Sequence, residues 1–355
     1  MNRVALNARF KTRPVTGVER FAIEVSDRLS HDSSMEMSEI SPAAPIQGLK
    51  GHAWEQLALP RQIGRDAVLF SPCNTGPISV KRQFVVIHDA AVWDCPDGFS
   101  GAFRQVYQQL LPRLAKRSLG VATVSEFSRK QLAPRLGIPE EKILVLGNAV
   151  SKAFSPNGNL NRPARDEIEL LCVGSMDPRK NLARLVRAWL DLKKHDRLPE
   201  NAVLNLVGGA NPRNFADFER AEDISLRWHG RVGDEELVRH YRHADAFIFP
   251  STYEGFGLPP LEAMACGCPV LLSHAASLPE VGGSGFDPSE SDSNGAVMYF
   301  DPHSDEEIKA AILRFLELAP EKRRRLRDNA LGRAATFSWD HIAGQVAGGI
   351  QQVAS

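Results

Sequence analysis

The chain has 355 residues, of which 43% are hydrophobic and 24% charged, and its 43 Lys and Arg side chains balance 43 Asp and Glu. This length suits two domains, and a net charge of zero gives no indication of bulk nucleic-acid binding. No apolar run approaches the ~18 residues of a membrane span, the N-terminus lacks a signal-peptide core, and the five cysteines form no disulfide or zinc pattern, so we expect a cytosolic protein.

The first 150 residues alternate runs of strand length with segments of helical periodicity. A strand at Arg3–Ala8 is followed by apolar residues at helical spacing from about Gly17, and a glycine between a strand and a helix N-terminus favours an anion. The further expected strands lack strict alternation, as is typical of a parallel sheet covered on both faces. They are Ala67–Pro72, Gln83–His88, Gly120–Ser125 and Lys142–Asn148.

His88 and Asp89 end the expected strand at Gln83–His88, and doubly wound sheets bind ligands at the carboxyl ends of their strands. A lone histidine is more often structural, so a core histidine and a ligand contact both stay open. No G-x-G-x-x-G follows any of these strands, which counts against a dinucleotide cofactor.

Positive charge gathers in the first part of the chain. Residues 1–150 hold 19 Lys and Arg against 14 Asp and Glu, a net of +5. Phe103–Leu119 is a helical candidate with basic side chains and an apolar stripe, and Pro112 is expected to kink it or to end a first helix at Leu111. Such a helix lies on a membrane surface or packs its stripe on a sheet, and the sequence leaves both open.

The second half begins with a linker-like segment, Lys152–Asp166, rich in Pro, Asn and Gly. The expected strand Glu167–Ser175 then leads into Pro178–Asn181, which contains Arg179 and Lys180 at a strand-to-helix junction. Two adjacent cations there suit a diphosphate, because charge-assisted hydrogen bonds are strong. A solvated basic turn is the alternative.

Pro250–Pro269 predicts a strand end, a glycine turn and a helix that starts at two prolines. The glycines let the backbone approach a ligand, and the helix N-terminus favours phosphate. Glu254 in the turn and Glu262 in the helix flank this junction. Alternatively, Glu262 merely complements the helix dipole.

The string EGFGLPPLEAMACGCPV, with Glu254 and Glu262 eight residues apart, resembles the Glu-x7-Glu signature of the retaining glycosyltransferase family 4. The resemblance is specific over residues 165–300, and over 1–150 it rests on Gly17, on IHDAAVW around His88 and on Val124–Leu132. It implies an α/β GT-B fold, in which two Rossmann-like doubly wound domains face each other across a cleft. The implied parts are an acceptor domain (1–152), a linker (153–166), a nucleotide-sugar domain (167–336) and a helix crossing back to the first domain (337–355).

The resemblance also implies roles for single residues. His88 and Glu254 are the implied catalytic residues, and Asp89 with Trp93 is a weaker prediction for the acceptor pocket. The family's diphosphate-binding Arg is Ser175 in this chain, so Arg179 is expected to substitute for it. The implied donor-binding residues are Gly17, Arg179, Lys180, Val232, Phe256, Gly257, Leu258 and Glu262.

The resulting hypothesis is a retaining transfer of a hexose to a saccharide or polyprenyl-diphosphate-linked acceptor in bacterial polysaccharide assembly. Mannose from GDP-mannose is the best guess, with UDP- and dTDP-sugars open. No Asp-x-Asp occurs, so no metal and no cofactor beyond the donor is expected. A non-catalytic nucleotide-sugar-binding partner and a sugar-nucleotide epimerase of the same fold are the alternatives. The expected location is cytoplasmic, with peripheral association with the inner face of the membrane open.

Overall fold

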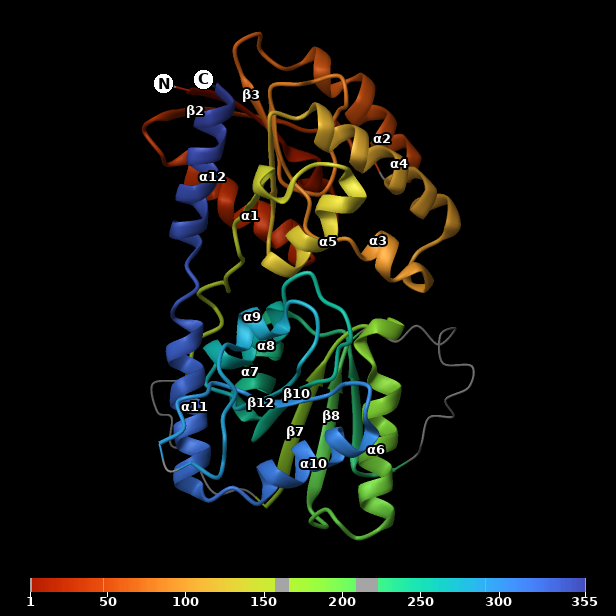
Figure 1. Cartoon of the computed structure of the whole chain (residues 1–355), viewed down its shortest axis with the longest axis vertical. Coiled ribbons are helices and arrows are strands. Elements are labelled where there is room, and N and C mark those ends of the chain that lie inside the picture. Colours follow the sequence, from red (N-terminus) through yellow and green to blue (C-terminus); the bar gives the residue numbers. More distant parts are fainter. Residues whose placement is uncertain (1, 47, 157–165, 209–222, 291, 355) are drawn as a thin grey trace. The chain divides into compact units, whose positions relative to one another are not determined.

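Figure 1 shows the protein as a computed structural model, which describes residues 2–46, 48–156, 166–208, 223–290 and 292–354. The chain divides into two compact units, one of Met1–Ala149 with Ser338–Ser355 and one of Val150–Phe337. Most of the segment expected to be a linker lies outside the described residues. Each unit is built on a six-stranded parallel sheet of its own.

The first sheet has the order β2-β1-β3-β4-β5-β6. The chain moves from β1 outward to β2 and then returns to the other side of β1, so the strand order reverses between β1 and β3. The strands are β1 (Asn2–Asn7), β2 (Met35–Ile40), β3 (Val68–Ser71), β4 (Gln83–Val86), β5 (Gly120–Thr123) and β6 (Ile143–Val145).

The second sheet has the order β12-β11-β10-β7-β8-β9, and here the reversal falls between β7 and β10. Ligands of doubly wound folds bind in the crevice at the carboxyl ends of the strands where the order reverses. The strands are β7 (Ile168–Val173), β8 (Ala202–Val207), β9 (Leu226–Gly230), β10 (Ala246–Phe249), β11 (Val270–Ser273) and β12 (Met298–Phe300).

Helices cover both sheets (Figure 1). Those of the first unit are α1 (Gly17–Ser30), α2 (Gly48–Leu57), α3 (Ala91–Asp94), α4 (Gly101–Arg117), α5 (Glu126–Leu136) and α12 (Trp339–Ala354). Those of the second unit are α6 (Leu182–Lys194), α7 (Asp234–His243), α8 (Leu258–Ala265), α9 (Leu278–Gly282), α10 (Asp305–Leu316) and α11 (Pro320–Ala334). Short 3-10 turns are η1 (Ala8–Thr12), η2 (Leu59–Arg61), η3 (Pro96–Gly98), η4 (Glu140–Lys142) and η5 (Pro178–Lys180).

The final helix, α12, belongs to the first unit and packs beside α1 (Figure 1). Trp339 at its start meets Phe21 of α1 edge to face, with 5.8 Å between the ring centroids. Arg28 of α1 donates from Nε to Asp340 Oδ1 at 2.6 Å. The buried apolar face of α12 therefore completes the first unit, because side chains of that face would otherwise be left in water.

Helix α4 runs through Pro112 without ending at Leu111. Its stripe is anchored in the core, since Leu111 and Leu114 are buried with Val85 and Val121 of the sheet. Burial of this face offsets the hydrogen bond that a proline removes from the helix. The stripe thus packs on the sheet, which is one of the two alternatives that the sequence left open.

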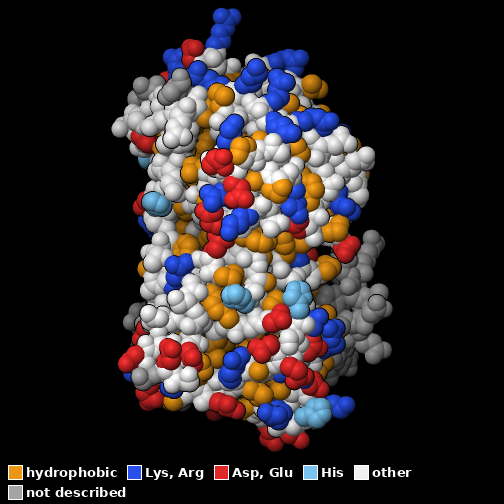
Figure 2. All heavy atoms as spheres, viewed as in Figure 1, with side chains coloured by type: hydrophobic (Ala, Val, Ile, Leu, Met, Phe, Trp, Pro, Cys, Tyr) orange, Lys and Arg blue, Asp and Glu red, His pale blue; other side chains and the backbone are white. Residues whose placement is uncertain are grey.

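Ser125, Cys266 and Cys268 have structural roles. Ser125 caps α5 by accepting a hydrogen bond from the Ser128 amide at 3.0 Å, and Cys266 and Cys268 are buried core residues. On the face shown in Figure 2, Lys and Arg side chains gather over the first unit, in keeping with its excess of positive charge. Within the described part of the chain, every helix is too short or too polar to cross a bilayer.

Candidate functional site

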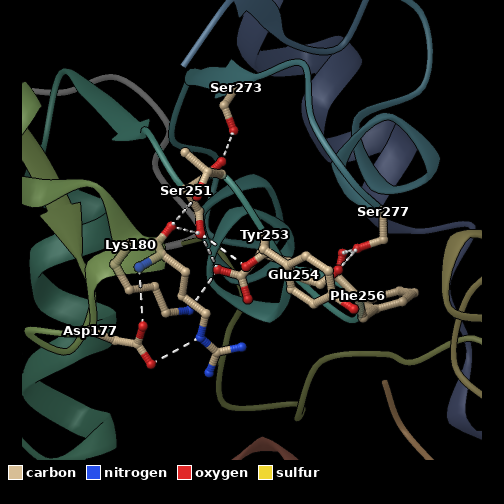
Figure 3. Close-up of polar contacts among 10 residues, drawn as sticks. Asp177, Lys180, Ser251, Tyr253, Glu254, Phe256, Ser273 and Ser277 are labelled. Carbon is tan, nitrogen blue, oxygen red and sulfur yellow. Dashed lines mark hydrogen bonds and ion pairs between the residues drawn. The ribbon is translucent and has the colours of Figure 1, made fainter. Parts of the chain in front are cut away.

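The second unit brings Lys180 and Glu254 together at the point where its strand order reverses. Lys180 follows β7 and Glu254 follows β10, the adjacent strand. Lys180 Nζ donates to Glu254 Oε1 at 2.6 Å, and the two side chains are only 14% and 10% exposed (Figure 3). Removing two charges from water costs free energy of desolvation. A nearly buried ion pair at the ligand-binding edge of a doubly wound sheet therefore marks a candidate site.

Three buried serines hold the loop that carries Glu254 (Figure 3). Ser251 Oγ donates to Glu254 Oε1 at 2.6 Å, and Ser273 Oγ donates to the Ser251 carbonyl at 2.5 Å. Ser277 Oγ lies 2.9 and 2.7 Å from the carbonyl oxygens of Glu254 and Phe256. The roles of these serines were not predictable from the sequence, because a serine in a loop carries no signal of the distant partner that it will bind.

The glycine turn and α8 follow the predicted pattern. Gly257 has φ +117°, which other residues rarely adopt, and a Cβ there would lie 2.7 Å from Leu278 Cδ2, so the backbone of this turn favours glycine. Leu258 is the first residue of α8, and prolines follow it as expected of a helix start. The ring of Phe256 is buried and meets Phe337 edge to face at 5.9 Å.

Glu262 is a buried carboxylate in α8, one turn from its N-terminus. Its Oε2 accepts a hydrogen bond from the hydroxyl of Tyr241, a fully buried residue of α7, at 3.1 Å. Burial, and then the nearby Glu262 carboxylate, raise the pKa of the Tyr241 phenol well above its usual value, so the phenol stays a donor. Tyr241 therefore orients Glu262, a role that the sequence did not reveal.

Arg179 and Lys180 take different partners. The Nε of Arg179 donates to Asp177 Oδ2 at 3.0 Å, and its carbonyl accepts from the Thr252 amide at 2.8 Å. Asn181, with φ +56°, donates from Nδ2 to the carbonyls of Pro250 and Pro302 and so joins the loops after β7, β10 and β12. Both cations therefore lie on the loop after β7, and Lys180 is the one that meets Glu254.

The last predicted donor-binding residue of the second unit, Val232, follows the edge strand β9 and is half-buried. Strands β7 and β8 end in backbone contact, because a Cβ on Gly208 would lie 1.8 Å from the Gly174 carbonyl oxygen.

Among the described residues, no cluster of three or more His, Cys, Asp or Glu side chains is placed to hold a metal ion.

In the first unit, His88 is buried two residues past the end of β4. Its Nε2 lies 2.8 Å from the Pro72 carbonyl, and its ring meets Phe21 edge to face at 5.0 Å. Since a carbonyl only accepts, Nε2 carries the proton. Burial lowers the pKa of His88, so the ring is neutral near pH 7 and its Nδ1 is an acceptor.

The other predicted residues of the first unit lie at the starts of helices or against the hydrophobic core. Asp89 Oδ1 accepts from the Ala91 amide at 2.9 Å, and Trp93 packs against the apolar core under α4. Gly17 is exposed at the start of α1, where the Glu19 carboxylate accepts from the Thr16 amide at 3.1 Å. Glu19 thus already complements the positive end of α1.

Two units, each built on a doubly wound six-stranded parallel sheet, form the architecture of the GT-B fold. A solved structure of HepE from Anabaena in complex with UDP and glucose matches with a TM-score of 0.71 at 16% identity, over 98% of this chain and 99% of that one. The model of the family "Glycosyl transferases group 1" matches residues 159–333. The prediction of the fold is thereby confirmed.

Two curated relatives are mannosyltransferases. The chain is 30% identical over 291 residues to O-antigen chain mannosyltransferase B of Escherichia coli, covering 79% of this chain and 73% of that protein. It is 31% identical over 245 residues to MMP alpha-(1->4)-mannosyltransferase of Mycolicibacterium hassiacum, covering 67% of this chain and 55% of that protein. The chain belongs to the group 1 family of glycosyltransferases.

Proposed function

We propose that the protein transfers mannose from GDP-mannose, with retention of the anomeric configuration, to a saccharide or lipid-linked saccharide acceptor in bacterial polysaccharide assembly. The names of the two relatives support the sugar, and the name of the Escherichia coli relative supports the pathway. The single observation that most supports the donor site is the Lys180–Glu254 ion pair, which lies where the strand order of the second sheet reverses. Glucose and UDP in HepE support a nucleotide sugar as the donor class.

The donor diphosphate is the leaving group, and its charge must be stabilised as the glycosidic bond breaks. Lys180 has three N–H donors, of which Glu254 takes one, so the ammonium can hold phosphate oxygens and the carboxylate together. Arg179 on the same loop adds a second cation, and the N-terminus of α8 adds its dipole. Preorganised charge of this kind is often the largest catalytic contribution, and it stabilises the leaving group without a metal ion.

The two glutamates contact different parts of the donor. Glu254, held by Lys180 and Ser251, accepts hydrogen bonds from hexose hydroxyls and stabilises positive charge at the anomeric carbon. Glu262, held by Tyr241, accepts from the ribose hydroxyls. The leaving phosphate oxygen takes the proton of the attacking acceptor hydroxyl, so the new bond forms on the face from which the nucleotide departs. In the first unit, Nδ1 of His88 accepts a hydrogen bond from a sugar hydroxyl.

A turnover assay tests this function. Purified protein is incubated with GDP-mannose, UDP-glucose or dTDP-glucose and a polyprenyl-diphosphate-linked saccharide extract, and the released nucleoside diphosphate is quantified. We expect GDP release from GDP-mannose, an α-linked product by NMR, and a fall of about 10- to 150-fold in turnover for Glu262→Gln. Glu307→Gln, a change of an exposed glutamate in the first turn of α10, is the matched control and should keep full turnover. Release of UDP or dTDP alone would overturn the donor, and an inverted product would overturn the mechanism.

A further inference from the structure

The loop of residues 72–78, which follows β3, holds His88 by its main chain and by its ring. The His88 amide donates to Asn74 Oδ1 at 2.8 Å, and its Nε2 donates to the Pro72 carbonyl at the same distance. The Thr123 hydroxyl, from β5, donates to the His88 carbonyl at 3.2 Å. Within the described part of the chain, these bonds occupy the polar groups of His88 other than Nδ1, which is therefore the group left to meet a ligand.

Asn74 has a backbone conformation that few residues other than glycine adopt. Its φ is +66°, in the left-handed region, which asparagine tolerates better than most side chains. Its own amide donates to the Val86 carbonyl of β4 at 2.9 Å. Asn74 therefore bonds twice to the segment that ends in His88, once by its main chain and once by its side chain. A left-handed residue persists where the surrounding structure holds it, and such residues cluster at functional sites.

A buried ion pair holds the next residue of the loop, Thr75. Arg9 and Glu55 are 3% and 1% exposed, and 3.6 Å separates Nη2 from Oε2. Arg9 Nη2 also donates to Thr75 Oγ1 at 3.1 Å. Burial would raise the pKa of Glu55, but His52, Arg9 and Asn7 outweigh burial and lower it, so the carboxylate stays ionised. Thr75 is thus bonded to a cation that its buried partner keeps in place.

Helix α2 holds the far end of the same loop. Gln56 Nε2 donates to the Gly76 carbonyl at 2.8 Å, and Gln56 Oε1 accepts from the Ile78 amide at 3.0 Å. A Cβ on Gly76 would lie 2.6 Å from Oε1 of Gln83, the first residue of β4, so the loop packs directly on that strand. The support of the His88 ring is therefore in place before any substrate binds, which is the preorganisation that catalysis requires.

We infer that Asn74 and Thr75 are positioning residues of the transfer reaction, because they hold the loop whose Pro72 carbonyl fixes the His88 ring with Nδ1 as acceptor. Both act through His88. The inference rests on the proposed function, in which Nδ1 of His88 accepts a hydrogen bond from a sugar hydroxyl. Loosening the loop exposes the ring to water and lowers the fraction of molecules with a correctly placed Nδ1. Turnover then falls, while binding of the donor to the second unit does not change.

Five variants of the full chain test this inference. Asn74→Gly keeps the left-handed backbone and removes the acceptor, whereas Asn74→Asp keeps an acceptor oxygen. Thr75→Val removes the hydroxyl that Arg9 contacts, whereas Thr75→Ser keeps it. Ser118→Ala is the control. It removes a hydrogen bond of 2.8 Å to the Leu114 carbonyl, and Ser118 precedes β5, whereas His88 follows the parallel strand β4, so the two lie at opposite ends of the sheet.

Two measurements distinguish positioning of His88 from general stability. In protein with isotope-labelled histidine, NMR follows the rate at which the Nε2 proton of His88 exchanges with water, and His88→Gln assigns its signal. The turnover assay with GDP-mannose gives kcat and KM separately, so that a loss of positioning is separated from a loss of donor binding.

We expect proton exchange to be about fivefold faster in Asn74→Gly and in Thr75→Val, which is the effect of losing one hydrogen bond. The kcat of both variants should fall about fivefold, with KM for GDP-mannose unchanged. Asn74→Asp, Thr75→Ser and Ser118→Ala should match the wild type in exchange rate, kcat and KM.

An unchanged exchange rate in Asn74→Gly or in Thr75→Val would overturn the inference. A rise in KM with kcat unchanged, or an equal change in Ser118→Ala, would overturn it as well. A wild-type protein that does not turn over GDP-mannose would instead overturn the proposed donor. The exchange rates would still decide whether the loop holds His88, so the two failures are distinct.

Discussion

Replacing Lys180 by Met tests two roles of its ammonium group, the ion pair with Glu254 and the proposed binding of the donor phosphate. The change removes the cation that contacts Glu254 at 2.6 Å and leaves that carboxylate, 10% exposed, with the hydrogen bond from Ser251. Breaking a fully buried pair costs about 3–5 kcal/mol and an exposed pair at most about 1 kcal/mol. At this intermediate burial we expect a loss of about 2 kcal/mol in the free energy of unfolding.

The double variant Lys180→Met with Glu254→Gln removes both charges, so no carboxylate is left without its cation. We expect its free energy of unfolding to return to within about 1 kcal/mol of the wild type. Affinity for GDP should not return, because a charge-assisted hydrogen bond to phosphate contributes about 1.5–3 kcal/mol, or about 10- to 150-fold. The single and double variants should therefore bind GDP equally weakly.

Urea unfolding and calorimetric titration with GDP measure the two quantities. Lys309→Met is the matched control, since Lys309 is 17% exposed and bonds to Asp191 at 2.8 Å on the outer side of α6 and α10. Asp191 is 45% exposed, so the control should lose less than about 1 kcal/mol of stability and keep its GDP affinity. If the double variant recovered GDP affinity, Lys180 would act only through Glu254, and its assignment to phosphate would be refuted.

Three further changes test the local geometry. Gly257→Ala places a Cβ 2.7 Å from Leu278 Cδ2 at φ +117° and should cost about 1–3 kcal/mol in thermal unfolding; an unchanged melting temperature would contradict the strained turn. Tyr241→Phe removes the donor to Glu262 and should cost about 1–2 kcal/mol in urea unfolding, whereas a neutral effect would mean that the carboxylate is held by other partners. Since burial lowers the pKa of His88, the unfolded chain takes up a proton there first, so stability falls as pH drops below about 6.5; His88→Gln should flatten this dependence, and an equal slope would assign it to another group.

The elements around the donor site follow from local residue chemistry. The glycines and prolines between Glu254 and Pro260 restrict the backbone so strongly that a turn and a helix start are readable without tertiary information. The same holds for the helix that begins after Asn181 and for the capping serine Ser125. Strands such as β7 are short apolar runs, so their existence was predictable. The ends of β7 lie one and two residues inside the expected range Glu167–Ser175.

Other elements depend on contacts between distant residues. Strand β2, with the sequence MEMSEI, lies at a sheet edge where only Met35 and Ile40 are buried, and its charges gave no strand signal. The partners of the two glutamates, Ser251 and Tyr241, were missed for a related reason. Each hydroxyl contacts a carboxylate only because the fold brings the two groups together, and no local sequence pattern predicts that contact.

Thermal stabilisation of the wild-type protein by GDP, UDP, dTDP and ADP tests the central claim most directly. A nucleotide at 100 times its dissociation constant should stabilise the protein by about 2.7 kcal/mol. We expect GDP to stabilise the protein, and this stabilisation to be weakened in Lys180→Met and kept in Lys309→Met. No stabilisation by any of the four nucleotides would contradict the donor site at the Lys180–Glu254 pair.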